Sequence, residues 1–335
     1  MNRLSELTPN QYQKSSRILK SLRLRLFLIE RVSMSNFIEI KGVVPVLSTP
    51  LDENRKLDKA TLRSEIGWVG QQGVQTVATG MVSEILRMNL DERRELTESV
   101  SLFAQEFNMN SIVSCGQETA EATISLVIHA QDSGATAVMV NPPIASKLTD
   151  DEIYNYFAQV FEKTSIPIVV QDASGYVGYS INVSVLSRLY DSYSNRIYFK
   201  PEAVPIGQRL SELRDATGGR ARIFEGTGGA HLVDSFTRGV IGTMPGADLS
   251  WAMVKLWNSL VAGDWKRVNL INGAIANMVN LMPVLDAYIA IEKHLLHKQG
   301  VFINTNKIEP VSFTFDLETK TEAERIFAYL EEIAR

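Results

Sequence analysis

Between Gly42 and about residue 249, short apolar runs alternate with longer stretches of helical periodicity, and this alternation limits the possible folds more than any other feature. Eight runs have the length of β-strands: Val43–Ser48, Thr76–Thr79, Ser111–Ser114, Ala137–Asn141, Pro167–Gln171, Ile197–Lys200, Arg222–Glu225 and Val240–Thr243. The stretches between them favour helices, among them Leu57–Gln72, Leu90–Glu106, Thr119–Ser133, Asp150–Lys163, Val183–Tyr190 and Ile206–Ala216. Because strands that are apolar on both faces are typical of a parallel sheet covered by helices, eight such units predict an α/β fold, a closed (β/α)8 TIM barrel.

The C-terminal part of the chain is predicted to be helical. Helical periodicity covers Ser250–Ala262, Trp265–Leu281, Leu285–Gln299 and Thr321–Ile333, with no convincing strand pattern between them. We expect packing or oligomer contacts from these helices rather than direct catalysis. The sequence thus predicts a barrel over residues 37–249 and a C-terminal helical region over residues 250–335 that packs on it.

The N-terminal segment differs in charge from everything after it. The first 33 residues carry seven Lys or Arg and two Glu, a charge of +5, which leaves −9 for the remainder of a chain whose net charge is −4. Ile18–Val32 alternates basic and apolar residues, as an organelle transit peptide does, whereas translation from Met34 would omit the segment. We expect residues 1–36 to be a disordered or removed extension of a cytoplasmic protein, or of a mitochondrial one if the extension is a transit peptide.

Composition narrows the class of partner. The 335 residues are 45% hydrophobic and 21% charged, which is typical of a soluble globular protein, and the net charge of −4 gives no general attraction to nucleic acid. No uninterrupted apolar window is long enough to span a membrane. The single cysteine, Cys115, excludes an intrachain disulfide, and His294 and His297 share a helical spacing without a nearby carboxylate pair. We therefore expect a small-molecule partner, and neither a metal nor an organic cofactor.

Lys200 is the ionisable side chain whose position most favours chemistry. It ends the sixth apolar run, and in a barrel of this kind the carboxyl ends of the strands converge on the active site. Burial there disfavours an ammonium group and makes a neutral amine available to attack a carbonyl. The alternative is that Lys200 reaches into water, as most lysines do. The context favours a Schiff-base lysine.

Residues at the other strand ends complete the predicted site. Glu202 would share the face of Lys200 if the strand continued, and would be a surface charge if the strand bent at Pro201. Glu84 could fix a turn rather than act as a base, and Asp172 could cap a helix or turn. The predicted catalytic residues are Lys200, Glu202 and Gln171. The predicted substrate-binding residues are Ser83, Glu84, Thr49, Asp172, Gly226, Thr227, Ile241 and Thr243.

Several motifs together resemble one enzyme superfamily. They are Gly42-Val43-Val44-Pro45 with Thr49-Pro50, Gly80-Met81-Val82-Ser83-Glu84 with Leu90-Asp91-Glu92-Arg93, Lys200-Pro201-Glu202, Glu225-Gly226 and Gly239-Val240-Ile241-Gly242. From about Gly42 to Gly263 the chain resembles the dihydrodipicolinate synthase and N-acetylneuraminate lyase superfamily. The resemblance implies a (β/α)8 barrel, often tetrameric, whose lysine forms an imine with pyruvate or another 2-oxo acid. Lys200 matches that lysine.

Three further strings narrow the resemblance to one branch. Val169-Val170-Gln171-Asp172-Ala173, Tyr198-Phe199-Lys200 and Gly239-Val240-Ile241-Gly242-Thr243-Met244 resemble the branch that includes 2-keto-3-deoxy-L-arabinonate dehydratase. The chain departs from the superfamily pattern at two places. Met81 and Val82 replace hydroxyl residues expected to hold the substrate carboxylate, and Ile144 stands where a tyrosine relays protons. Proton transfer would then fall to water, the substrate carboxylate, or the side chains of Ser83, Gln171, Ser174, Thr227, Tyr176 or Tyr179.

The chemistry of a lysine imine permits two outcomes. The protonated imine acidifies the C3 hydrogens, and the resulting enamine either expels a 4-hydroxyl group or reverses an aldol bond. With Ile144 in place of the tyrosine, we predict a class I lyase that dehydrates a 2-keto-3-deoxy sugar acid. The alternatives are a pyruvate-dependent 2-oxo acid aldolase, a dihydrodipicolinate-synthase-type condensation, or an inactive 2-oxo acid sensor. A homo-oligomer, either a tetramer or a dimer, is expected.

Overall fold

The structure is a computed structural model that describes residues 39–334, apart from the side chains of Tyr176 and Val177. Residues 41–335 form one compact unit. The predicted extension over residues 1–36 lies outside the described residues, and so does its proposed role as a transit peptide. The predicted boundary between residues 249 and 250 falls inside the compact unit and stays a prediction.

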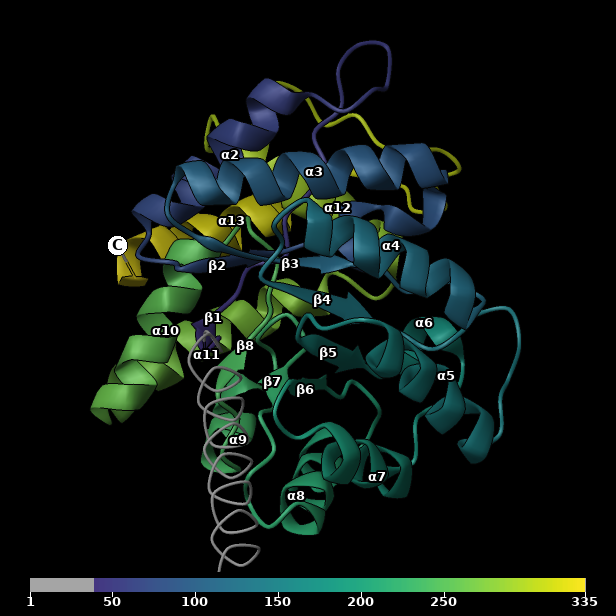
Figure 1. Cartoon of the computed structure of the whole chain (residues 1–335). Coiled ribbons are helices and arrows are strands. Elements are labelled where there is room, and N and C mark those ends of the chain that lie inside the picture. The colour runs from purple at the N-terminus through teal and green to yellow at the C-terminus, as the bar shows by residue number, and fades with distance from the viewer. Residues whose placement is uncertain (1–38, 335) are drawn as a thin grey trace, which may run out of the picture. The chain divides into compact units, whose positions relative to one another are not determined.

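Eight short parallel strands form the centre of this unit (Figure 1). Five of them pair in the order β2-β3-β4-β5-β6 and three in the order β1-β8-β7. Parallel bridges between Val46 and Ala78 and between Phe199 and Ile223 join the two sets, so the ring of strands is closed and the predicted barrel is confirmed. The strands are β1 (Gly42–Val43), β2 (Thr76–Ala78), β3 (Asn110–Ser114), β4 (Ala137–Val140), β5 (Ile168–Gln171), β6 (Ile197–Lys200), β7 (Phe224–Glu225) and β8 (Gly242–Thr243).

Three strands are shorter than the sequence predicts by two residues or more. β1 ends at Val43, whereas the prediction ran from Val43 to Ser48, and the predicted strands Arg222–Glu225 and Val240–Thr243 each keep two residues. Pro45 has no N–H group to donate, which interrupts regular pairing after β1. Single hydrogen bonds still continue the barrel wall there, since Val46 N donates to Pro245 O at 2.7 Å and Leu47 N donates to Ala78 O at 2.8 Å.

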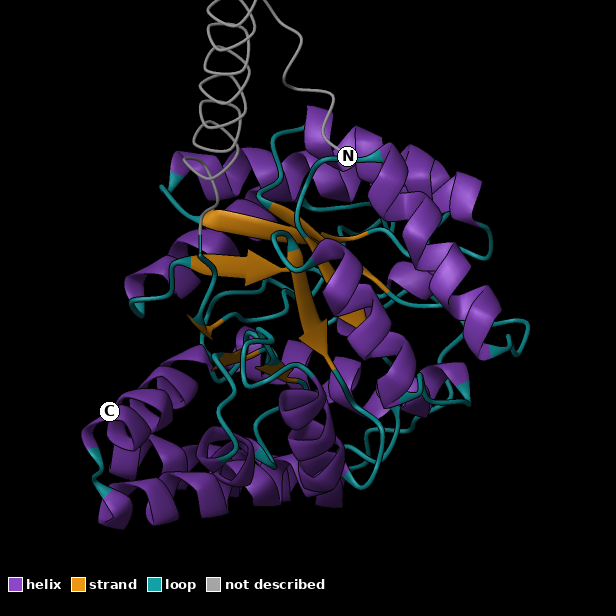
Figure 2. Cartoon of the chain, turned by 60° about the horizontal axis from the view of Figure 1, so that its bottom comes forward, coloured by secondary structure: helices purple, strands orange, loops and turns teal. Residues whose placement is uncertain are grey.

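Helices lie around the strands, with loops between them (Figure 2). The helices within the barrel sequence are α2 (Lys59–Gln71), α3 (Leu90–Glu106), α4 (Ala120–Asp132), α5 (Asp150–Lys163), α6 (Ser174–Val177), α7 (Val183–Tyr193), α8 (Ile206–Ala216) and α9 (Leu232–Thr237). Several begin at side-chain caps, and Asn89 with Glu92 forms a capping box at the start of α3. α6 and α9 are not among the predicted helices, because four and six residues are too few to show a helical period.

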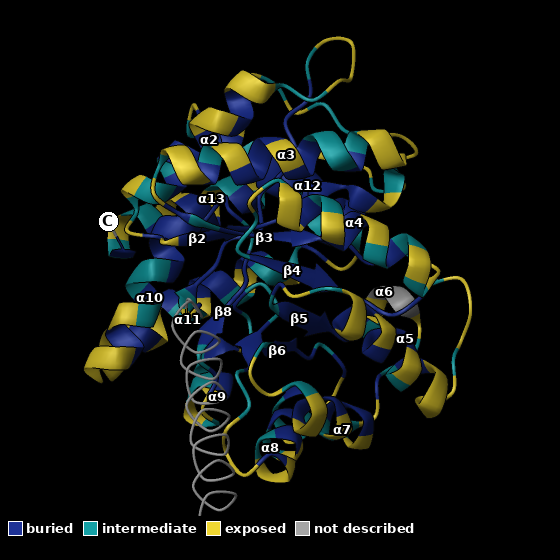
Figure 3. Ribbon diagram, in the orientation of Figure 1, coloured by how far each residue is buried: buried dark blue, intermediate teal, exposed yellow. Residues whose placement is uncertain are grey.

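The four C-terminal helices are α10 (Ser250–Ala262), α11 (Trp265–Asn280), α12 (Leu285–Lys298) and α13 (Leu317–Ala334). They share a buried apolar cluster that also includes Val43 of β1 and Leu232 of α9, so they pack on the barrel. Burial is greatest along the strands and the inner faces of the helices (Figure 3). This packing brings α12 to the carboxyl end of the barrel, where Lys293 forms an ion pair with Glu84, and both side chains are 0% exposed.

Candidate active site

The alternation of side chains along β5 and β6 directs two polar groups into the barrel. Ile168 and Val170 of β5 and Ile197 and Phe199 of β6 belong to the apolar cluster between strands and outer helices. Successive side chains of a strand point to opposite faces, so Gln171 and Lys200 point inward. The two residues are direct partners in the parallel register, which places them side by side at the ends of their strands.

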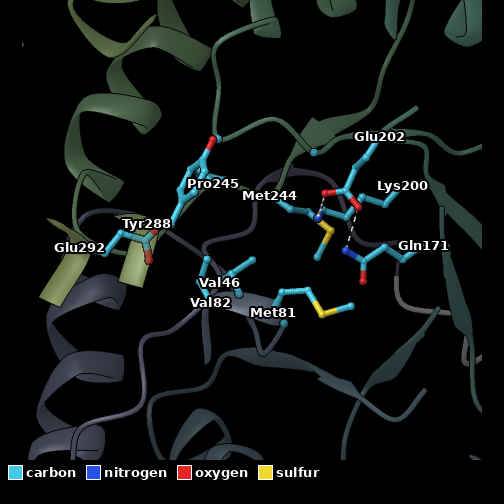
Figure 4. A pocket seen from close by; sticks show the side chains of 14 residues that line it. Val46, Met81, Val82, Gln171, Lys200, Glu202, Met244, Pro245, Tyr288 and Glu292 are labelled. Carbon is cyan, nitrogen blue, oxygen red and sulfur yellow. Dashed lines mark hydrogen bonds and ion pairs between the residues drawn. The ribbon is translucent and has the colours of Figure 1, made fainter. Parts of the chain in front are cut away.

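A pocket with a cavity volume of about 60 Å³ lies at this end of the barrel (Figure 4). Lys200 is 5% exposed, so its amine is largely shielded from bulk water. Most of the lining continues the inward face of the strands, since Gly80, Glu202, Gly226 and Met244 each stand two residues beyond an inward position. The lining residues are Val46, Gly80, Met81, Val82, Gln171, Lys200, Glu202, Gly226, Gly228, Met244, Pro245, Gly246, Tyr288 and Glu292.

Lys200, Glu202 and Gln171 form one hydrogen-bonded group. Lys200 Nζ donates to Glu202 Oε1 at 2.8 Å, and Gln171 Nε2 donates to Glu202 Oε2 at 2.8 Å. Both carboxylate oxygens are thereby fixed, with one of them against the amine. Gln171 Oε1 is buried and has no hydrogen-bond partner in the described part of the chain, so it is available to a ligand in the pocket.

Gly226 leaves the space that this group occupies. A Cβ atom on residue 226 would lie 3.0 Å from Lys200 Cε and 2.9 Å from Glu202 Cγ, both too close for ordinary contact. Two residues later, a Cβ atom on Gly228 would lie 3.5 Å from Cε1 of Tyr288. The bare backbone of the loop after β7 therefore separates the lysine wall of the pocket from a second wall.

The second wall comes from α12 and holds Tyr288 and Glu292, opposite Lys200, Glu202 and Gln171 (Figure 4). Neither residue is among the predicted site residues, because this helix was expected only to pack or to form oligomer contacts. Their spacing of four residues places them on one face of the helix, and this spacing was the available signal. Burial raises the pKa of Tyr288 to about 12, and the carboxyl groups of Glu292, Glu225 and Glu202 add to this effect.

The turn after β2 is held by residues that were predicted to bind substrate. Ser83 Oγ accepts a hydrogen bond from Gly80 N at 3.0 Å and donates one to Leu47 O. Thr49 Oγ1 donates to Ser83 O at 2.7 Å. Glu84 has a left-handed backbone (φ 62°), pairs with Lys293 and accepts from Ile308 N at 2.7 Å. Ser83, Thr49 and Glu84 therefore fix the turn and lie outside the pocket lining.

Four more predicted binding residues have their side chains directed elsewhere. Asp172 accepts from Ser174 N at 3.0 Å and Ile181 N at 3.2 Å, so it caps the loop after β5, and burial raises the pKa of its carboxyl group. Thr227 and Thr243 both donate to Glu225, and Ile241 is also absent from the pocket lining. Ile241 and Thr243 alternate with the inward Gly242 and Met244, which is why they miss the pocket. Gly226 is the predicted binding residue that lines it.

Ile144 and the loop tyrosine Tyr179, which was predicted as a substitute for the family tyrosine, both lie away from the pocket. Ile144 lies outside the pocket lining, and its N–H donates to Glu118 Oε1 at 2.9 Å. Tyr179 donates its hydroxyl proton to Pro143 O at 2.9 Å and does not line the pocket. The side chain of Tyr176 lies outside the described residues. Tyr288 is thus the tyrosine that the structure brings into the pocket.

The histidines predicted to share a helical spacing and the single cysteine have other surroundings than a metal site. Within residues 39–334, no three His, Cys, Asp or Glu side chains form a cluster suited to a metal ion. His294 Nε2 is 2.8 Å from Glu324 Oε1, and His297 Nδ1 is 2.9 Å from Phe302 O. Cys115 is buried, and burial raises the pKa of its thiol to about 12. Of the helices that the structure describes, none combines the length and apolar character needed to cross a membrane.

Comparison with known proteins settles the family. The model of the dihydrodipicolinate synthetase family matches residues 39–329, nearly all of the described chain. The chain belongs to this family. Its members in other organisms include the 4-hydroxy-tetrahydrodipicolinate synthase of Bartonella bacilliformis, which is 28% identical over 181 residues, covering 53% of this chain and 60% of that protein. A lyase of Pyrococcus abyssi is 24% identical over 266 residues, or 78% of this chain and 88% of that protein.

Solved structures share the fold. YagE, a prophage protein of Escherichia coli K12 from the same family, was solved with pyruvate and superposes with a TM-score of 0.79 and 21% identity, over 88% of this chain and 99% of that one. The dihydrodipicolinate synthase of Aquifex aeolicus gives a TM-score of 0.79 at 18% identity, with the same coverage. These identities establish a shared barrel fold. The chain spans only 60% of the length of the Bartonella relatives, so its activity is a matter for proposal.

Proposed function

We propose that this protein is a class I lyase that binds a small 2-oxo acid as an imine of Lys200 and dehydrates a 2-keto-3-deoxy sugar acid. The observation that carries the proposal is the buried Lys200, whose amine lies inside the barrel and 2.8 Å from a carboxylate oxygen of Glu202, which Gln171 holds in place. A buried amine with an adjacent proton acceptor is the arrangement that carbonyl condensation requires. Family membership supports the same chemistry.

Imine formation begins with removal of a proton from the lysine. Glu202 Oε1 is the placed acceptor, since it already receives the hydrogen bond of Lys200 Nζ at 2.8 Å. The neutral amine then attacks C2 of the 2-oxo acid, and Glu202 returns the proton to the departing water. Gln171 keeps Glu202 oriented through both steps, and its free Oε1 is placed to accept a hydrogen bond from a substrate hydroxyl group.

The substrate carboxylate is expected to lie against the turn after β2. Gly80, Met81 and Val82 border the pocket, and Ser83 N is the N–H group that closes this 3-10 turn by donating to Gly80 O. The N–H groups of Met81 and Val82 precede it and have no partner within the turn. Backbone donors thus take the place of the hydroxyl groups that Met81 and Val82 lack.

The charge of the pocket favours a sugar acid over a substrate with a second carboxylate. Among the 14 lining residues, Lys200 is the cation and Glu202 and Glu292 are acids. Imine formation uses that lysine, so a second carboxylate would face acids without a matching cation. The hydroxyl groups of a sugar acid would instead find hydrogen-bond acceptors and donors in the side chains of Gln171, Glu202 and Tyr288. With Ile144 outside the pocket, no residue takes the place of the family tyrosine from that direction, which disfavours tyrosine-run aldol cleavage.

Product analysis tests this proposal. The protein is incubated with five- and six-carbon 2-keto-3-deoxy acids, and the products are separated by mass spectrometry. We expect loss of one water with all carbons retained, and no turnover by a Lys200→Arg variant, because a guanidinium cannot form the imine. Released pyruvate would show carbon–carbon cleavage and contradict the dehydratase assignment. Turnover by Lys200→Arg would contradict the Schiff-base mechanism itself.

A pyruvate-dependent aldolase or condensation is the second candidate function. It is favoured by the curated relatives, since the Bartonella proteins are 4-hydroxy-tetrahydrodipicolinate synthases. An inactive 2-oxo acid sensor is a further alternative, and it would form the imine but release no product from any acid. The residues that favour it are Met81, Val82 and Ile144, which differ from the superfamily pattern. Two further predictions remain. The protein is expected to be a dimer or tetramer, which sedimentation velocity measures, and to be located in the cytoplasm or the mitochondrion.

A further inference from the structure

Three buried carboxyl groups lie at the α12 wall of the pocket and behind it. Glu65 comes from α2, Asp248 from the segment before α10 and Glu292 from α12, and they are 0%, 3% and 2% exposed. Of the three, Glu292 lines the pocket that contains Lys200. A buried carboxyl group is far less costly when it is protonated than when it is charged. Burial therefore favours the protonated form of each carboxyl group, and the trio meets the pocket at Glu292.

One serine and one glycine connect the trio. Glu65 Oε1 accepts from Ser48 N at 3.0 Å, and Glu292 Oε2 accepts from Ser48 Oγ at 3.5 Å. A Cβ atom on Gly246 would lie 2.6 Å from Glu292 Cδ and 2.8 Å from Asp248 Oδ1. The carboxyl groups of Glu292 and Asp248 thus border the same bare backbone position, and only glycine leaves room for both.

A second, smaller cavity joins Asp248 to Glu292. Its volume is about 20 Å³, and both carboxyl residues line it together with Tyr288, Gly228 and Pro245, among others. A single water needs about 10–15 Å³ of this kind of space and two or more polar partners. Asp248 Oδ2 is buried and has no hydrogen-bond partner among residues 39–334. The cavity therefore suits one water that would pass a proton between Asp248 and Glu292.

The charges around Glu292 favour its protonated form. Burial raises the pKa of Glu292 and of Glu65 well above the usual range, and repulsion by Asp248 and Glu65 adds to the effect at Glu292. Burial also raises the pKa of Asp248 to about 7. The cation that faces the trio is Lys293, which Glu84 already pairs and which donates to Asn306 O at 2.6 Å.

We propose that Glu292 is the general acid that protonates the departing 4-hydroxyl group of the substrate, and that Asp248 and Glu65 are positioning residues that keep it supplied with a proton. This inference rests on the proposed dehydratase function and supplies the acid that the function lacks once Ile144 replaces the family tyrosine. Glu292 faces Lys200 across the pocket, so an imine-bound substrate extends from the lysine wall toward it (Figure 4).

The elimination step balances as follows. The C3–H bond of the imine breaks, its proton passes to the carboxylate of Glu202, and its electron pair forms the C2=C3 bond of the enamine on Lys200. The O–H bond of Glu292 then breaks, and its proton passes to the 4-oxygen of this enamine. The C4–O bond breaks with its electron pair, and water leaves. The C2=C3 pair of the enamine forms the C3=C4 double bond, while the nitrogen lone pair restores the C=N bond. Glu292 is left as a carboxylate and regains a proton from Asp248 or through the water of the small cavity.

Tyr288 is the other proton-bearing group on this wall. Its pKa is raised to about 12 by burial, so its phenol gives up a proton far less readily than a carboxyl group. No hydrogen bond joins its hydroxyl to another residue that the structure describes. We therefore assign Tyr288 a hydrogen-bonding role toward substrate hydroxyls, which makes it the natural comparison for Glu292.

The test compares Glu292→Gln with Tyr288→Phe in the full-length protein. Pyruvate carries no 4-hydroxyl group, so both variants are expected to form the Lys200 imine with it and to give the borohydride-trapped adduct. With 2-keto-3-deoxy-L-arabinonate, Glu292→Gln is expected to lose about 10²–10⁴-fold in elimination rate, the range typical of a general acid. Tyr288→Phe is expected to keep an elimination rate well above that of Glu292→Gln.

The pH profile provides a readout that a purely structural role would not change. Elimination by the native protein is expected to decline at high pH as Glu292 loses its proton, and this limb should be absent from Glu292→Gln. Asp248→Asn removes a neighbouring negative charge, which lowers the pKa of Glu292, so the limb should move to lower pH.

Each result has a distinct meaning. Failure of the native protein to form any adduct with pyruvate refutes the proposed function, whatever Glu292 does. Adduct formation by Glu292→Gln together with a native elimination rate and pH profile overturns the role of Glu292. Loss of elimination in Tyr288→Phe but not in Glu292→Gln overturns it as well. If Glu292→Gln forms no adduct, the Asp248→Asn variant provides the test. A high-pH decline of its elimination rate at the same pH as in the native protein contradicts the proposal.

Discussion

Two buried lysines in this chain have opposite surroundings, and the contrast explains why one is assigned chemistry. Lys200 lines a cavity, and its partner Glu202 lines the same cavity. Lys293 lies outside that lining, with Glu84 and Asn306 O as its acceptors, and connects the turn after β2 to α12 and to the segment before α13. The first lysine can exchange its partner for a substrate, whereas the second is a structural tie.

Glu84→Gln tests the structural role. The substitution leaves Lys293 as a buried cation without a carboxylate, so we expect the free energy of unfolding to fall by about 3–5 kcal/mol. The control is Glu95→Gln, which breaks the exposed Lys59–Glu95 pair, where we expect a loss of less than about 1 kcal/mol. Urea denaturation of both variants gives the comparison, and equal losses would show that the buried pair has no special importance.

At the level of elements, strand periodicity predicted the barrel well and the site only in part. Eight apolar runs predicted eight strands, and the ends of β5 and β6 placed Gln171, Lys200 and Glu202 together. The same alternation explains the misses, because Ile241 and Thr243 fall on the outward face while Gly242 and Met244 fall on the inward one. A count of inward positions from Lys200 along each strand would have chosen Gly80, Gly226 and Met244.

The pattern of the strands could not predict that α12 contributes residues to the pocket. Its residues are about 90 positions from Lys200 in the sequence, and no local pattern indicates that a helix after the barrel reaches over its carboxyl end. Tertiary packing alone brings Tyr288 and Glu292 to the pocket. The spacing of four residues between Tyr288 and Glu292 indicates a shared helix face, but it does not show what that face contacts.

For the whole molecule, the buried carboxyl trio predicts how stability depends on pH. The folded state keeps a proton on Asp248 up to about pH 7, whereas the unfolded chain releases it near pH 4. Between these values the folded state binds more protons, so stability declines as pH rises, by about 1.4 kcal/mol per pH unit for each such group. Glu65 and Glu292 act in the same direction, because their pKa values are also raised.

Asp248→Asn isolates this effect. The neutral side chain cannot release a proton, so we expect the decline in unfolding free energy between pH 5 and pH 7 to become shallower by about 1 kcal/mol per pH unit. Burial lowers the pKa of His294, so this residue makes stability rise with pH. Its contribution is the same in the variant and the native protein and cancels in the comparison. Parallel urea titrations at several pH values measure the difference, and identical slopes would show that Asp248 is ionised in the folded protein.

The most direct measurement of the central claim is borohydride reduction of the protein in the presence of pyruvate, followed by mass spectrometry of its peptides. Covalent bonding to the amine that faces Glu202 predicts one added three-carbon acid, located on the peptide that contains Lys200, and none on the peptide that contains Lys293. An adduct on Lys293 or on a surface lysine, or no adduct at saturating pyruvate, would contradict the account.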